Sequence, residues 1–118
     1  MLVATKGGKV VGTVSIGGAR FQMRNSLRLF ALDVGAAFRR QGIGTALVKT
    51  VEAVATDRGL EAINLEVAID NTDAIRLYER LGFRVCGDPV MDHWQRRRED
   101  GTDELIEVES FVMVKELA

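Results

Sequence analysis

The chain has 118 residues, of which 47% are hydrophobic and 28% are charged, and its formal net charge at pH 7 is -1. This composition is that of an ordinary globular protein and excludes a disordered or collagen-like chain. The length predicts one domain over residues 1–118. Because the net charge is close to zero, the chain has no general attraction for nucleic acid or anionic membranes, so any anion site must be local.

The single cysteine, Cys86, excludes an internal disulfide and a CxxC metal or redox site, and we expect it to pack within a strand. A lone cysteine also fits a reducing compartment. The chain has no apolar run of about 18 residues that would span a membrane, and its first residues lack the order of a signal peptide. We therefore expect a cytoplasmic protein with no membrane partner.

The first part of the chain predicts three strands. Leu2–Thr5 and Lys9–Ile16 are β-rich runs separated by KGGK, a sequence that suits a tight hairpin turn. A looser polar stretch follows over residues 17–26, and residues 27–34 then alternate as a third strand with one buried face. That face is predicted to hold Leu27, Leu29 and Ala31.

Two helices with a strand between them are predicted next. The first helix begins at Ile43, and Gly59 is its natural C-terminal stop. Residues 62–68 alternate as a strand, and a second helix opens at the capping residue Asn71 and stops at Gly82. The apolar positions of the first helix recur at helical spacing: Ile43, Ala46, Leu47, Val51, Val54 and Ala55.

The remaining chain predicts a short strand in FRVCG, a polar loop, and a final strand over residues 106–117. In the loop we expect His93 to be exposed or to line an acceptor pocket, and Trp94 to pack under the loop rather than to cover the acceptor site. Arg96–Arg98 are interleaved with acidic residues, so we expect them to be solvated rather than to bind nucleic acid. His93 is the only histidine and no ligand spacing surrounds it, so we expect no metal site. The whole order predicts a mixed α/β sheet with helices on its faces.

The sequence RRQGIGTALV places two arginines and two glycines at the start of the first helix. A helix start presents backbone N–H groups and the positive end of the macrodipole, so it attracts phosphate. The P-loop pattern fails because no glycine precedes Lys49, and GxGxxG fails because Leu47 stands in place of its last glycine. The residues alone leave two interpretations open: a pyrophosphate site, or a tight strand-to-helix connection.

Two stretches in register resemble the GNAT superfamily of N-acetyltransferases. Arg39, Gly42 and Gly44 fill its acetyl-CoA signature, and NTDAIRLYERLGF resembles its second signature. Within the superfamily, the segment LEV before Asn71 is most similar to the ribosomal-protein alanine N-acetyltransferases. The resemblance implies the GNAT fold, a mixed central sheet with a splayed strand pair and flanking helices.

The resemblance also implies acetyl-CoA as a cosubstrate. Backbone groups of Leu32 and Val34 would hold its pantetheine arm, and the N–H groups of residues 40–45 would hold its pyrophosphate. The implied coenzyme-binding set is Leu32, Asp33, Val34, Arg39, Arg40, Gln41, Gly42, Ile43, Gly44, Thr45, Asn71 and Tyr78.

The same resemblance implies that Glu66 is the base that takes a proton from the acceptor amine and that Tyr78 is the acid beside the thioester sulfur. From the residues alone, Glu66 would also fit a solvated strand position, and Tyr78, the only tyrosine, a core aromatic. A phenol pKa of about 10 exceeds a thiol pKa of about 8.5, so a hydrogen bond to the thiolate is expected rather than full proton transfer.

The implied reaction is direct attack on acetyl-CoA, in a ternary complex, by a primary amine of a protein N-terminus or a small molecule. The alternative is a non-catalytic acyl-CoA-binding module. Relative to the GNAT pattern, the sequence lacks the usual first strand and first two helices, which wall the acceptor site, so either it is truncated or another subunit covers the exposed sheet edge. We expect a homodimer.

Overall fold

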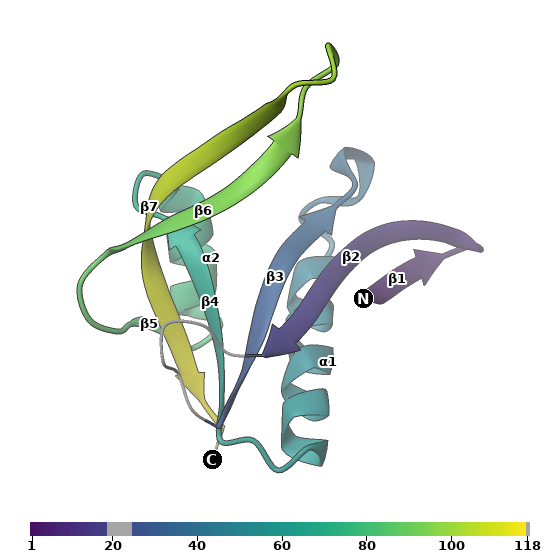
Figure 1. The fold of residues 1–118 in the computed structure, drawn as a ribbon. Coiled ribbons are helices and arrows are strands. Elements are labelled where there is room, and N and C mark those ends of the chain that lie inside the picture. The colour runs from purple at the N-terminus through teal and green to yellow at the C-terminus, as the bar shows by residue number, and fades with distance from the viewer. Residues whose placement is uncertain (19–24, 118) are drawn as a thin grey trace. The chain divides into compact units, whose positions relative to one another are not determined.

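The computed structural model describes residues 1–18 and 25–117 (Figure 1). These residues form two compact units. One unit is built from the described residues between 1 and 65 together with 114–117, and the other from residues 66–113. The elements in chain order are β1 (Leu2–Lys6), β2 (Lys9–Gly18), β3 (Ser26–Val34), the 3-10 turn η1 (Ala36–Phe38), α1 (Ile43–Asp57), β4 (Ala62–Ala68), α2 (Thr72–Arg80), β5 (Arg84–Val85), β6 (Val90–Arg97) and β7 (Asp103–Glu116).

The strands follow the order β1-β2-β3-β4-β7-β5, and β6 pairs with β7. The β1–β2, β2–β3 and β6–β7 pairs are antiparallel, whereas β3 and β4 are parallel and joined through α1. The first unit contains β1 to β3 and α1, the second contains α2, β5 and β6, and β4 and β7 contribute to both. The predicted mixed α/β sheet is confirmed.

The hairpin that opens the chain is confirmed. Its last rung pairs Lys6 with Lys9, and the two turn residues have φ of 59° at Gly7 and 80° at Gly8, the left-handed values that a two-residue hairpin turn requires. The polar stretch predicted over residues 17–26 is wrong at both ends, because β2 continues to Gly18 and β3 already begins at Ser26. The part of that prediction over residues 19–24 lies outside the described residues.

Strand β3 carries a bulge that the alternation did not predict. Ser15 pairs with Phe30, but Thr13 pairs with Asp33, so β3 contains one residue more than β2 in this interval. Ala31 has a φ of 52°. Because an inserted residue reverses which side chains face the core, Ala31 is exposed and Leu32 is half-buried, and the predicted buried face is correct only for Leu27 and Leu29.

Helix α1 packs directly on β2 within the first unit. A Cβ atom at Gly12 would come within 3.0 Å of Ile43 Cγ2 and 3.1 Å of Leu47 Cδ1, so the missing side chain allows this close approach. The predicted helix and its stop at Gly59, which has a φ of 72°, are confirmed. Ala46 is exposed, contrary to prediction. The buried residues of the helix are Leu47, Val48, Val51 and Ala55.

In the second unit, the capped helix and its end at Gly82, which has a φ of 98°, are confirmed. The strand predicted in FRVCG is reduced to Arg84–Val85, and Cys86 is exposed rather than packed, because the chain turns away at Gly87, where φ is 76°. Neither α1 nor α2, the helices of the described residues, has the length and apolarity to cross a membrane.

The polar loop predicted before the last strand is wrong. Val90–Arg97 forms β6, which pairs with β7 along its whole length, and β7 begins at Asp103 rather than at residue 106. Ion pairs join the strands where the sequence is most charged. Arg96 Nη2 lies 2.8 Å from Glu104 Oε2, and Arg97 Nε lies 3.1 Å from Asp103 Oδ1. Cross-strand pairs of opposite charge stabilise a sheet modestly, so these residues support a strand.

The side chains of β6 differ in part from the prediction. His93 is exposed as expected, with Nε2 3.7 Å from Glu107 Oε1 on the neighbouring strand. Trp94 is 48% exposed and does not pack beneath a loop as predicted. The arginines at positions 96–98 are more than half exposed and face acidic side chains, as the interleaved charges predict.

Candidate functional site

The chain passes from β3 into α1 through an exposed turn formed by residues 35–42, the glycine turn. Gly42 is the N-cap of α1 and has a φ of 80°, in the left-handed region. A Cβ atom there would meet nothing within 4 Å, so the conformation, not crowding, requires the glycine. Arg40 also has a positive φ, of 64°, which is uncommon for a residue with a side chain.

The first turn of α1 leaves its backbone donors available. The first intrahelical bond of the turn runs from Ala46 N–H to Gly42 C=O at 2.9 Å, so the amides of residues 43–45 have no acceptor within the helix. The N-cap makes no side-chain hydrogen bond, and no acidic residue lies in this turn. Together with the helix dipole, these amides form a place where an anion is stabilised.

Gly44 differs from Gly42. It does not have a positive φ, and a Cβ atom there would lie 3.8 Å from Val34 Cγ2, which is an ordinary contact. Packing and backbone conformation among the described residues therefore do not require glycine at position 44. Its absent side chain leaves the backbone of the first helical turn uncovered, as close approach of a ligand requires. A tight strand-to-helix connection accounts for Gly42 but not for Gly44.

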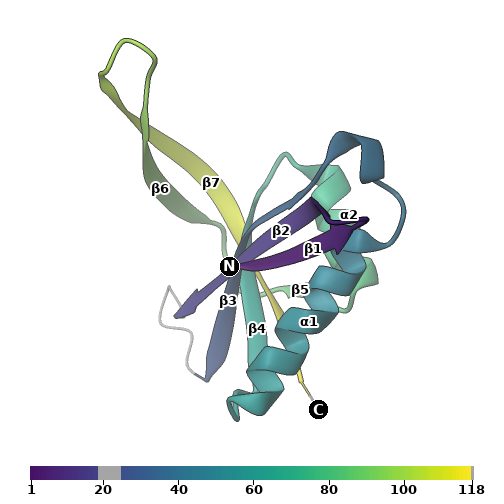
Figure 2. The same ribbon diagram turned by 90° about the vertical axis from the view of Figure 1, so that its right-hand side faces the viewer.

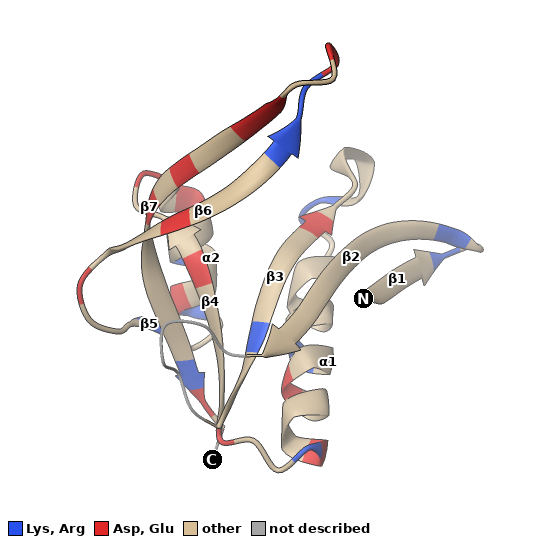
Figure 3. Cartoon of the chain, in the orientation of Figure 1, with Lys and Arg blue, Asp and Glu red and all other residues tan. Residues whose placement is uncertain are grey.

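Charged and polar residues occur in the glycine turn and at the hairpin end that contacts it; Figure 3 shows which segments of the ribbon contain Lys or Arg, in blue. Arg39 Nε donates a hydrogen bond to the Val34 carbonyl at 3.3 Å, which holds the guanidinium at the end of β3. Gln41 Oε1 accepts a hydrogen bond from Lys6 Nζ at 3.2 Å. Sequence reasoning missed Lys6, because nothing in the local pattern indicates that the hairpin end meets this turn.

The predicted pantetheine strand has a distinctive edge. The ladder between β3 and β4 covers only Ser26 to Arg28 on β3 and ends at the pair Arg28↔Asn64. Residues 29–34 of β3 therefore have ladder partners only on the β2 side among the described residues. Leu32 and Val34 are half-buried and Asp33 is exposed. The described part of the chain leaves a strand edge on which backbone groups can pair with an extended ligand.

The second unit contains the other predicted site residues. Glu66 on β4 is half-buried, and its Oε2 atom is fully buried. Asn71 caps α2 by accepting the Ala74 N–H at 3.3 Å, so its predicted structural role is confirmed. Tyr78 on α2 is half-buried and meets Phe83 edge to face, with ring centroids 5.7 Å apart. Burial raises the pKa of Tyr78, which keeps the phenol a hydrogen-bond donor at neutral pH.

Each unit thus brings part of the predicted site together. The first unit joins the β3 edge, the arginines and the first turn of α1, and the second contains Glu66, Asn71 and Tyr78. That both sets meet on one coenzyme molecule stays a prediction. Among the described residues, no three His, Cys, Asp or Glu side chains gather as metal ligands do.

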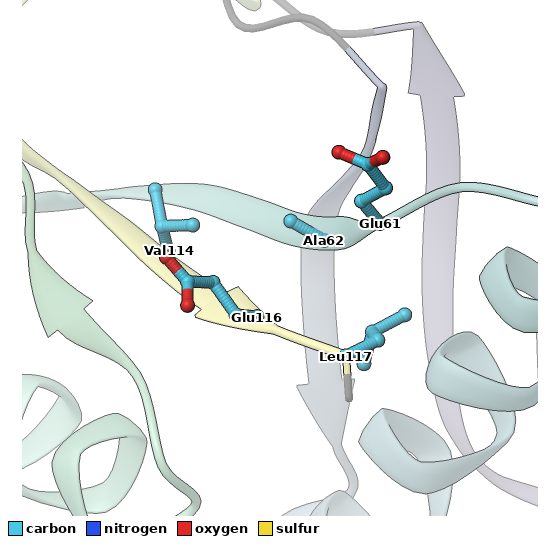
Figure 4. Close-up of a pocket in the computed structure, with 5 residues that line it drawn as sticks. All are labelled: Glu61, Ala62, Val114, Glu116 and Leu117. Carbon is cyan, nitrogen blue, oxygen red and sulfur yellow. The ribbon is translucent and has the colours of Figure 1, made fainter.

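A pocket of about 470 Å³ lies elsewhere in the first unit, where β4 begins and β7 ends (Figure 4). It contains no predicted site residue. Its lining combines two carboxylates with small or apolar side chains: Glu61, Ala62, Val114, Glu116 and Leu117. Because it offers neither a helix start nor a cation, it does not suit the phosphates of a coenzyme.

Sequence reasoning also missed a buried polar pair beside the end of the β3–β4 ladder. Ser26 Oγ donates to Asn64 Oδ1 at 2.6 Å, a distance typical of an O–H···O bond. Asn64 is fully buried. The alternation of residues 62–68 predicted the strand correctly but gave no sign that this amide would lie inside.

Comparison with known proteins decides the family. The sequence profile of the Acetyltransferase (GNAT) family matches residues 1–83, which include the glycine turn and all predicted site residues. The chain belongs to the GNAT family of acetyltransferases. The mouse protein "Probable N-acetyltransferase family 8 member 5" is 43% identical over 89 residues, which are 72% of this chain and 38% of the mouse protein. The chain therefore spans less than half the length of this curated relative.

Solved structures of GNAT enzymes share the fold. The ribosomal-protein-S18-alanine N-acetyltransferase of Escherichia coli superposes with a TM-score of 0.68 at 25% identity, over 97% of this chain and 66% of that one. This likeness confirms the resemblance to the alanine N-acetyltransferases. A GNAT family acetyltransferase from Elizabethkingia anophelis, solved with acetyl-CoA bound, has a TM-score of 0.72 at 20% identity, over 98% of this chain and 74% of that one.

Proposed function

We propose that this GNAT chain is an acetyl-CoA-dependent N-acetyltransferase that acetylates a primary amine. The observation that carries the proposal is the first turn of α1, where a left-handed Gly42, uncovered amides and two arginines form an anion site in a family that transfers acetyl groups. The acetyl-CoA-bound structure from Elizabethkingia anophelis supports this choice of cosubstrate.

The binding residues divide by the part of the coenzyme that they meet. The amides of residues 43–45, with Gln41 and Gly42, hold the pyrophosphate, and Arg39 and Arg40 add positive charge. Leu32 and Val34 lie on the part of β3 that does not pair with β4, and their backbone groups pair with the pantetheine arm. Asn71 contacts the same arm while it caps α2.

The chemistry needs an uncharged amine and an outlet for negative charge on sulfur. Glu66 takes a proton from the acceptor ammonium, directly or through water. The amine nitrogen then forms a bond to the thioester carbon, the carbon–sulfur bond breaks, and Tyr78 donates a hydrogen bond to the departing thiolate. The second amine proton leaves with the thiol or with solvent, so the products are the N-acetyl compound and coenzyme A.

The acceptor is either a protein N-terminus or a small-molecule amine. An α-amine has a pKa of about 8, against about 10.4 for lysine, so it needs less help to lose its proton. The likeness to the S18-alanine N-acetyltransferase of Escherichia coli is consistent with such an acceptor. We further propose a cytoplasmic homodimer that binds neither nucleic acid nor membranes.

Release of thiol from acetyl-CoA in the presence of an amine panel tests the proposal. We expect turnover by the unmodified chain, and at least about a hundredfold loss in Glu66→Gln, the scale of general acid–base catalysis. Tyr78→Phe should lower the rate less, by about tenfold, as loss of one hydrogen bond does. Coenzyme binding without turnover would instead support the alternative of a non-catalytic acyl-CoA-binding module.

A further inference from the structure

The β1–β2 hairpin brings a lysine to the glycine turn. Lys6 Nζ donates to Gln41 Oε1 at 3.2 Å, across 35 positions of the sequence. Gln41 lies between Arg40 and Gly42, both of which have left-handed φ. Figure 2 looks along the direction in which the hairpin end overlaps the segment that leads into α1, and the Lys6–Gln41 hydrogen bond joins the two. The ammonium group therefore stands at the rim of the proposed pyrophosphate site.

The β1–β2 hairpin fixes the position of the Lys6 backbone and so limits where its ammonium group can lie. Lys6 forms the last rung before the turn, paired with Lys9, so its backbone is held by the sheet and only its side chain must be ordered. A Cβ atom at either turn glycine would meet nothing within 4 Å, so the hairpin end is open to a ligand. The geometry places Lys6 opposite the turn rather than among the residues of the helix.

The charge of Lys6 is not neutralised by its partner. Gln41 offers a neutral amide oxygen, and no carboxylate among residues 1–18 and 25–117 forms an ion pair with Lys6. Arg39 and Arg40, which directly precede Gln41 in the sequence, are cationic as well. Like charges held near one another are unfavourable until an anion joins them. The cluster is thus arranged to receive a group that carries more than one negative charge.

We propose that Lys6 is a coenzyme-binding residue whose ammonium group binds a phosphate of coenzyme A at the glycine turn. This inference rests on the proposed function, because the same turn is assigned to the coenzyme. The phosphate is either the pyrophosphate or the 3′-phosphate of the adenosine part, which share the chemistry of an exposed phosphoryl oxygen bound by a cation.

Calorimetric titration of coenzyme A into the full chain tests the proposal with three variants. Lys6→Ala removes the side chain, and Lys6→Gln removes the charge but keeps a donor for Gln41. Lys9→Ala is the matched control, because Lys9 is the residue that pairs with Lys6 across the hairpin and its removal takes away the same charge. We expect both Lys6 variants to weaken binding about threefold to fivefold, as loss of an exposed ion pair does, and Lys9→Ala to bind as the unmodified chain does.

A second titration with 3′-dephospho-coenzyme A separates the two phosphates. If Lys6 binds the 3′-phosphate, the unmodified chain and Lys6→Ala bind this probe equally. If Lys6 binds the pyrophosphate, the ratio seen with coenzyme A persists. Either result supports a phosphate contact and says which phosphate is bound.

Two results would overturn the inference. One is that Lys6→Gln binds coenzyme A as tightly as the unmodified chain, and the other is that Lys6→Ala and Lys9→Ala lose affinity equally. Both leave the proposed function intact, because the unmodified chain still binds and turns over. Absence of coenzyme binding by the folded, unmodified chain, with near-ultraviolet circular dichroism as the check of folding, would instead remove the proposed function and the Lys6 contact with it.

Discussion

The two helices of this chain begin in opposite ways. Helix α2 starts with Asn71, whose side chain caps the helix, followed by Asp73 in the first turn, and it ends with Arg80 in its last turn. Helix α1 starts with Gly42, which has no side chain to cap it, and has no acidic residue in its first turn and no basic residue in its last. Arginines precede it instead.

Helix α2 is therefore stabilised at its ends by its own residues, whereas the dipole of α1 would be compensated by a bound anion. A cap and charges that oppose the dipole each stabilise a helix by about 0.3–1 kcal/mol or more, and α2 uses all of them. Helix α1 lacks them, and the arginines at its N-terminus destabilise it until an anion is bound. Its stability comes from the apolar face against the sheet, which includes Val48 and Val51.

The strongest test of this comparison is Gly42→Val. A β-branched residue at a φ of 80° costs about 1–2 kcal/mol, and relaxing the turn moves the amides, so coenzyme affinity should fall at least about tenfold. Gly59→Val is the matched control, because Gly59 has a φ of 72° in open space at the other end of α1. It should lose similar stability in urea unfolding and keep its affinity. Equal loss of affinity in both variants would contradict the assignment.

Removal of the cap of α2 should act on stability first. Asn71→Ala loses the hydrogen bond to the Ala74 N–H, so the free energy of unfolding should fall by about 1 kcal/mol. Asn71→Asp keeps a capping oxygen and should unfold at nearly the same urea concentration as the unmodified chain. Any fall in coenzyme affinity in Asn71→Asp would then report the predicted pantetheine contact. If Asn71→Ala were as stable as the unmodified chain, α2 would not depend on its cap.

The charge at the start of α1 should have a smaller effect, of opposite sign on binding and on stability. Arg40→Ala should weaken coenzyme binding about threefold yet leave the free chain as stable or a few tenths of a kcal/mol more stable, because it removes a cation from the positive end of the dipole. Arg58→Ala, at the C-cap of the same helix, should leave affinity unchanged. Loss of stability without loss of affinity in Arg40→Ala would be the contrary result.

The smallest effect concerns pH. Burial raises the pKa of Tyr78, so the native state holds the phenol proton more tightly than the unfolded chain does. This contribution to stability is present below the unfolded pKa of about 10 and is lost as pH rises through the native pKa. Tyr78 is the only tyrosine, so phenolate absorbance reports it alone and should give a midpoint above 10. A midpoint at or below 10 would contradict the buried donor.

The sequence predicted local structure best where one residue type decides it. The turn at Gly7 and Gly8, the cap at Asn71 and the stop at Gly59 are all confirmed, because each depends on a conformation or hydrogen bond within a few residues. Alternation failed at Ala31, since a bulge depends on the register with β2. Polar composition was misleading for β6, because the charged side chains that predicted a loop form ion pairs with residues of β7.

For the candidate site too, the sequence predicted the local features but not those that depend on distant parts of the chain. The motifs placed the glycine turn and the residues of α2, but the β3 edge depends on where its ladder with β4 ends, at Asn64, and no local pattern marks that position. The contact between Lys6 and Gln41 joins residues 35 positions apart. Only the fold reveals which lysine reaches the turn.

The most direct test of the account is to follow the backbone amide resonances of the full chain while coenzyme A is added. We predict saturable shifts, largest at Ile43, Gly44 and Thr45, which weaken as salt concentration rises. A well-folded chain in which these three amide resonances do not shift, or in which the largest shifts lie elsewhere in the molecule, would contradict a coenzyme site at the start of α1.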